Sequence, residues 1–104
     1  MEDILKKISD IIETYESGTW QSAENLRVML RELSANYYFL TKINIESFNK
    51  HNAVQYDYKG SVAAGLIFAN LLVPELRMTR KILFATSKCV DAIRSELSII
   101  KNEN

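Results

Sequence analysis

Residues 60–74 read GSVAAGLIFANLLVP and form the longest stretch of the chain without a charged side chain. These 15 residues are too few for a membrane-spanning helix, which needs about 20 apolar residues. The apolar residues at 62–64, 66–69 and 71–72 surround a helix on every side, a pattern typical of a helix covered by neighbours. The stretch therefore predicts a central, buried helix.

Small residues mark one side of this helix, and a proline ends it. Ser61, Gly65 and Ala69 recur every four residues, so they form a groove that another helix can approach closely. Ser61 is also the expected N-cap. Pro74 lacks a backbone N–H, so it either opens the next helix or kinks one continuous helix.

Helical periodicity also marks the residues before this stretch. Apolar residues at three- and four-residue spacing predict a helix over 2–16, which ends at Ser17 and Gly18, with Gly18 in the left-handed conformation. A second helix begins near Thr19 or Ser22 and continues to about residue 49. The expected core stripe of this second helix consists of Leu26, Met29, Leu30, Leu33, Tyr37, Leu40, Ile43 and Phe48.

A loop is expected over 48–59, where Asn49, Asn52 and Asp57 favour turns. The last helix is expected over about 75–101, with Glu75 in its first turn. The residues of this helix that share its core face are Met78, Ile82, Cys89, Val90, Ile93, Leu97 and Ile100.

These elements predict an all-α fold, a small helical bundle of three to four helices in a single domain, residues 1–104. The second helix is longer than a compact domain of 12.0 kDa needs. It also carries apolar residues outside its core stripe, which predicts a subunit interface in a homo-oligomer. The residues of this predicted interface are Val28, Tyr38, Phe39 and Ile45.

The charges balance overall but are unevenly distributed. The chain has 13 basic and 13 acidic residues, and this zero net charge argues against a strongly basic nucleic-acid binder. Residues 1–18 contain five acidic and two basic side chains, whereas residues 59–104 contain four acidic and seven basic ones. The acidic first helix and the basic last helix could neutralise each other by packing together.

The residues needed for catalysis or metal binding are nearly absent, because the chain has one histidine and one cysteine. Cys89 lies on the expected core face, where a free cysteine acts as a small hydrophobic residue. His51 is expected to be a solvated loop residue. Zinc needs three or four ligands at set spacing, and no such pattern occurs. We therefore predict no enzyme activity, no metal or cofactor, and no small-molecule substrate.

The most specific surface feature is on the last helix. The residues 77–88 contain four basic side chains and no acidic one, and an aromatic ring lies on the same side of the helix. This basic face consists of Arg77, Arg80, Lys81, Phe84 and Lys88. It suits a protein partner with an aromatic anchor, or a nucleic acid whose phosphates bind the cations. The alternative is that the acidic first helix covers it and that Phe84 packs inside.

Two segments, Leu30–Tyr38 and Val73–Arg77 followed by Arg80-Lys81 and Asp91–Ser98, resemble short helical proteins encoded by bacteriophages. The resemblance spans about residues 26–101 and implies a phage or prophage accessory protein. The single cysteine and the absence of a leader-like start favour the reducing cytoplasm of a bacterial host and no membrane partner. The expected function is self-association and binding of a host or phage protein. Nucleic-acid binding in phage DNA replication or recombination is the alternative.

Overall fold

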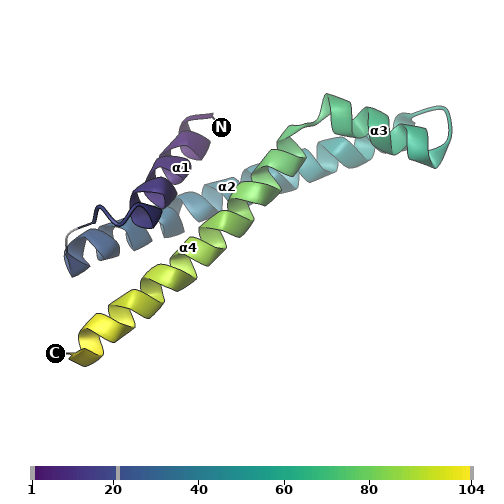
Figure 1. The fold of residues 1–104 in the computed structure, drawn as a ribbon. Coiled ribbons are helices and arrows are strands. Elements are labelled where there is room, and N and C mark those ends of the chain that lie inside the picture. The colour runs from purple at the N-terminus through teal and green to yellow at the C-terminus, as the bar shows by residue number, and fades with distance from the viewer. Residues whose placement is uncertain (1, 21, 104) are drawn as a thin grey trace.

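The structure, a computed structural model, describes residues 2–20 and 22–103. Within these ranges the chain forms helices and no strand. The four helices are α1 (Glu2–Glu16), α2 (Ala23–Asp57), α3 (Val62–Leu72) and α4 (Glu75–Glu103) (Figure 1). The prediction of an all-α bundle with long second and last helices is confirmed. The molecule is elongated, with extents of 63 × 23 × 21 Å.

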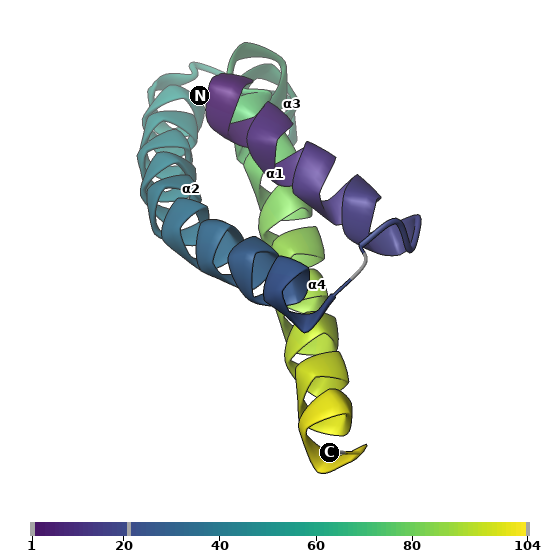
Figure 2. The same cartoon turned by 90° about the vertical axis from the view of Figure 1, so that its left-hand side faces the viewer.

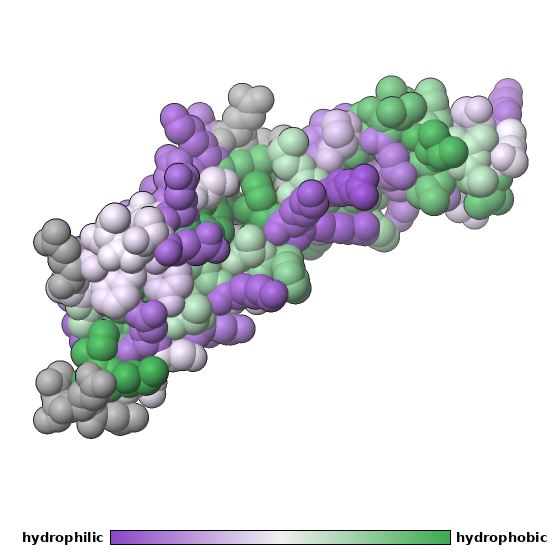
Figure 3. All heavy atoms as spheres, in the orientation of Figure 1, coloured by the Kyte–Doolittle hydropathy of each residue, from purple (hydrophilic) through white to green (hydrophobic). Residues whose placement is uncertain are grey.

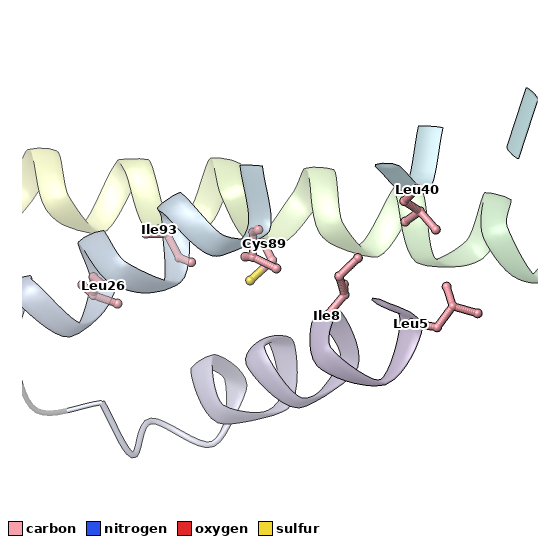
Figure 4. Packing of buried hydrophobic residues seen from close by; sticks show 7 residues of the cluster. Leu5, Ile8, Leu26, Leu40, Cys89 and Ile93 are labelled. Carbon is pink, nitrogen blue, oxygen red and sulfur yellow. The ribbon is translucent and has the colours of Figure 1, made fainter. Parts of the chain in front are cut away.

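The core lies where three helices meet. α2 and α4 run antiparallel, and α1 packs on this pair, parallel to α4 (Figures 1 and 2). Buried residues recur every seven positions along α2, a spacing that keeps them facing one partner helix. Figure 4 shows how the three helices contribute to this cluster, which consists of Leu5, Ile8, Leu26, Leu33, Leu40, Cys89 and Ile93. Three members of the expected core stripes, Tyr37, Phe48 and Met78, remain exposed instead, since α1 covers only one side of the α2–α4 pair.

The helix ends follow the expected capping chemistry. The hydroxyl of Ser22, not that of Thr19, caps α2 and accepts a hydrogen bond from the backbone N–H of Asn25 at 3.2 Å. The hydroxyl of Ser61 caps α3 in the same way and accepts a hydrogen bond from the backbone N–H of Ala64 at 3.1 Å. After α1, Gly18 has a φ of +69°, the left-handed conformation that glycine adopts without strain.

Pro74 separates two helices rather than kinking one. α3 and α4 meet at an angle of 72° across Val73 and Pro74. The carbonyl of Pro74 accepts a hydrogen bond from the N–H of Met78 at 3.2 Å, so Pro74 opens α4. Of the two alternatives for this proline, the start of a new helix is therefore correct and the kink in a continuous helix is wrong.

The loop expected over 48–59 is wrong for most of its length. α2 continues through this segment to Asp57. Ser47 and His51 in this part of the helix are buried. Because α3 folds back on α2 here, burial of this surface outweighs the turn preference of Asn49 and Asn52.

α3 is not the central helix that its composition predicts. It packs against the C-terminal part of α2, and α1 lies over the opposite half of α2 (Figure 1). Of the residues of α3, only Gly65 and Ala69 are buried. The reason is length, since the 15 residues of α1 span only about 22 Å and do not reach α3. Most of the apolar surface of α3 is therefore exposed.

Candidate functional site

The first candidate site is the outer surface of α3, and its position follows from how α3 is seated on α2. A Cβ atom added to Gly65 would lie 3.3 Å from the carbonyl oxygen of Gln55, so the two helices are in close contact. The predicted close approach at the small residues is confirmed for Gly65 and Ala69, which are buried, whereas Ser61 is exposed and caps α3. Nε2 of His51 also lies 2.8 Å from Oδ1 of Asn70, which joins the two helices by a hydrogen bond.

This seating leaves the large apolar side chains of α3 on the outside. They are exposed by between 40 % and 82 % of their surface, with Val62 and Leu71 the most exposed. Hydrophobic side chains gather at this end of the molecule in Figure 3. We call this surface the α3 outer face, and it consists of Val62, Leu66, Ile67, Phe68, Leu71 and Leu72.

The α3 outer face has a high density of exposed apolar side chains. Six of the 11 residues of α3 are large, apolar and at least 40 % exposed. Large apolar surfaces are rare on monomeric proteins and mark interaction sites. The site is absent from the sequence prediction because an uncharged helix is typical of a covered one. The signal was present in the absence of any charge from 60 to 74.

The second candidate site is the basic face of α4. The side chains of Arg77, Arg80, Lys81 and Lys88 are all exposed. α1 packs on α4 as expected, and Glu16 of α1 lines a pocket together with Phe84 and Lys88. The cations nevertheless stay exposed, so the expectation that α1 covers them is wrong. Among the described residues the only ion pair joins Arg27 and Glu24, at 3.4 Å.

Aromatic rings accompany these cations. Phe84 is 64 % exposed, so the alternative that it packs under α1 or α3 is also wrong. The Lys88 ammonium lies 4.6 Å from the centre of the Phe84 ring. The Arg80 guanidinium lies 5.8 Å from the centre of the Phe48 ring of α2. Each arrangement is a cation–π contact in reach of solvent.

A groove at the junction of α2, α3 and α4 continues the basic face. Arg77 and Arg80 border it, together with Phe48, His51 and Asn70. None of its lining residues is acidic; the others are Asn52, Gln55, Leu66, Val73, Pro74 and Leu76. The groove therefore combines a mixed polar and apolar lining with two guanidinium groups.

The four residues predicted as a subunit interface lie on the surface of α2. Val28, Tyr38, Phe39 and Ile45 are all exposed. Tyr38 and Phe39 contact each other edge to face, with ring centres 5.5 Å apart. The subunit interface itself stays a prediction.

The two side chains considered for chemistry are both buried and belong to the packing. His51 lies in α2 with 6 % of its surface exposed, and the expectation of a solvated loop residue is wrong. Cys89 belongs to the core, as predicted, and burial raises the pKa of its thiol. A raised pKa lowers the thiolate fraction at neutral pH, which makes the thiol a poor nucleophile. Within 2–20 and 22–103, no three His, Cys, Asp or Glu side chains gather where they could hold a metal ion.

In the part of the chain that the structure describes, no single helix has the length and apolar character to cross a membrane. Only α3 and α4 taken together pass that test, and they are bent by 72°. No family model matches the chain, and no curated protein or solved structure shows significant similarity to it. The surfaces described above are therefore the basis for a functional proposal.

Proposed function

We propose that this protein is a non-enzymatic helical interaction module that self-associates through the α3 outer face. One observation carries the proposal. Six large apolar side chains of α3 are exposed at one end of the molecule, and no charged residue occurs from 60 to 74. Burial of such a surface against a partner is favourable, because it removes apolar side chains from water.

A second copy of the chain suits the apolar character of this face. Ile67 and Leu71, on the side of α3 away from α2, are 62 % and 75 % exposed, and Tyr56 beside α3 adds an exposed ring. α3 against its own copy can therefore supply the apolar centre of a two-fold interface.

The charge distribution also favours self-association. Two copies of the α3 outer face bring no charged side chain of α3 together, so neither copy has to bury an unpaired charge. The zero net charge of the chain adds little repulsion between copies. On the side of α3 away from α2, Ala63, Ile67 and Leu71 recur at four-residue spacing. The small side chain of Ala63 leaves room there for a crossing helix.

As a module of this type the dimer would present its remaining surfaces to a further partner, in line with the expected binding of a phage or host protein. The exposed rings of Tyr38 and Phe39 on α2 lie outside α3 and stay available for such a contact. They are also the rival dimer interface. The molar masses of variants on α3 and on α2 separate these two assignments.

The test is the molar mass in solution, measured by light scattering after size exclusion over a range of protein concentrations. The expected result is twice the monomer mass of 12.0 kDa. Ile67→Glu and Leu71→Glu should each give the monomer mass, because each buries a carboxylate in the proposed interface. Ile99→Glu is the matched control, since it replaces an exposed apolar residue of α4 far from α3.

Two results would contradict the proposal. A wild-type protein that stays monomeric at all concentrations would overturn self-association altogether. A dimer that survives Leu71→Glu but dissociates with Phe39→Glu would place the interface on α2 instead of α3. Far-UV circular dichroism of each variant shows whether it keeps its helices.

A further inference from the structure

We propose that the basic face of α4 binds single-stranded nucleic acid, by contacts to phosphates and by stacking of unpaired bases on Phe84. The proposal goes beyond self-association and uses a different surface. It rests on the exposure of four cations, on their lack of ion pairs and on the aromatic rings beside them. Had α1 covered this face, the cations could not bind a nucleic acid.

The cations are free to bind a polyanion. Arg77, Lys81 and Lys88 lie on the side of α4 opposite its core residues, and none of them forms an ion pair within the described ranges. Arg80 is exposed on the flank that faces α2 and also borders the junction groove. Each phosphate that they bind would release condensed counterions, which is the main source of affinity for nucleic acids.

The positions of the cations suit a strand that runs along the helix. Lys81 follows Arg77 after one turn, and Lys88 follows Lys81 after two more turns. From Arg77 to Lys88 the helix axis extends about 16 Å. α4 is an uninterrupted helix over Glu75–Glu103, so these three side chains follow one side of a single helix.

The aromatic rings favour an unpaired strand over a duplex. Phe84 lies between Lys81 and Lys88 on this edge and exposes 64 % of its surface. Its ring offers a platform on which a base can stack, and this contact is independent of the base sequence. In a duplex the bases already stack on one another and are inaccessible to such a ring.

The existing cation–π contacts keep both partners of each pair in position. Lys88 already lies over Phe84, and Arg80 lies over Phe48 at the mouth of the junction groove. A strand crossing both pairs would meet a positive charge and a ring at each of two places. The absence of acidic residues from the lining of the junction groove removes local repulsion of phosphate.

The test is the fluorescence anisotropy of a labelled 20-nucleotide oligothymidine, titrated with the full chain at several salt concentrations. A labelled 20-base-pair duplex is titrated in parallel. We expect saturable binding of the single strand, with log K falling against log salt at a slope of about −3 for four phosphate contacts. The duplex should bind at least tenfold more weakly.

Variants test the assigned residues. Lys81→Gln with Lys88→Gln should reduce the slope by about half, because each lost contact removes about 0.7 from it. Phe84→Ala should weaken binding about fivefold or more without changing the slope. Arg31→Gln with Lys42→Gln removes the same charge from the exposed side of α2 and is the matched control. Tyr37→Ala, which removes another exposed ring of α2, is the control for Phe84→Ala.

No saturable binding at low salt would overturn the proposal, as would equal effects of the α4 variants and their α2 controls. If the duplex bound with the same affinity as the single strand, and Phe84→Ala left that affinity unchanged, the assignment to an unpaired strand would be overturned. Leu71→Glu separates this proposal from the previous one. Loss of the dimer without loss of oligothymidine binding would show that the two surfaces act independently.

Discussion

The Nε2 atom of His51 in α2 lies 2.8 Å from the Oδ1 atom of Asn70 in α3. Because an amide oxygen only accepts, the imidazole donates this hydrogen bond. His51 is buried, so its donor has little access to water as a substitute. The pair therefore links α3 to α2 through the only imidazole of the chain.

We predict that Asn70→Leu weakens the attachment of α3. The substitution leaves the Nε2 donor of His51 without an acceptor, which costs about 1–3 kcal/mol. Urea unfolding should show this loss, and hydrogen exchange should become faster in α3 than in α1. Asn49→Leu on the exposed surface of α2 is the control. An unchanged stability for Asn70→Leu would show that the hydrogen bond adds nothing.

Tyr15 links α1 to α4 and makes stability depend on pH in the alkaline range. Its hydroxyl donates a hydrogen bond to Oε1 of Glu96 at 3.0 Å. Burial, this hydrogen bond and the negative charge of Glu96 raise the pKa of Tyr15 from 10.0 to about 12. Folding therefore favours the protonated phenol. This contribution is complete below pH 10 and is lost as the pH rises towards 12.

The prediction for Tyr15→Phe has two parts. At pH 7 the variant should lose about 1 kcal/mol of unfolding free energy with the hydrogen bond. Between pH 10 and 12 its stability should fall less steeply than that of the wild type. Urea unfolding at pH 7, 10 and 11.5 measures both, with Tyr56→Phe as an exposed control. Parallel pH profiles for wild type and Tyr15→Phe would contradict the role of this phenol.

Two buried threonines of α4 should respond differently to the same substitution. Thr79 accepts a hydrogen bond from Nδ2 of Asn44 at 2.8 Å, and its own hydroxyl donates to the carbonyl of Glu75. The hydroxyl of Thr86 donates only within its helix, to the carbonyl of Ile82. Thr79→Val therefore leaves the amide of Asn44 without its partner, whereas Thr86→Val leaves no other side chain unpaired.

We expect Thr79→Val to lower the unfolding free energy by about 1–3 kcal/mol, and Thr86→Val to lower it by less. The two variants have the same change in shape, so each is the control for the other. Thermal and urea unfolding give both values. The reverse order of stability would show that the Asn44–Thr79 contact does not hold α2 against α4.

Cys89 should react slowly with alkylating reagents in the folded protein. Its thiol is buried in the core, and burial raises its pKa, so both access and thiolate fraction are low. Iodoacetamide at pH 7 should modify it far more slowly than it modifies free cysteine, and denaturant should remove the difference. Mass spectrometry over time measures this. Rapid modification of the folded chain would reopen the question of an enzymatic role for the thiol.

The local features of the fold could be predicted from the sequence. The bounds of α1, the caps Ser22 and Ser61 and the left-handed Gly18 depend on residues that are neighbours in the chain. Leu26, Leu33 and Leu40 could be assigned to the core because the periodicity of α2 places them on one face. The basic face could also be identified, since it needs only the helical positions of Arg77, Lys81 and Lys88.

By itself the sequence determined where the four helices lie, apart from the continuation of α2 to Asp57, and which sides of each helix are apolar or charged, because these properties depend on spacing along the chain. Only the tertiary structure decided which sides are covered. α1 is too short to extend over α3, so an apolar helix remains exposed, and it packs beside α4, so the cations remain accessible. Coverage depends on the lengths and positions of elements distant in sequence, which no local pattern contains.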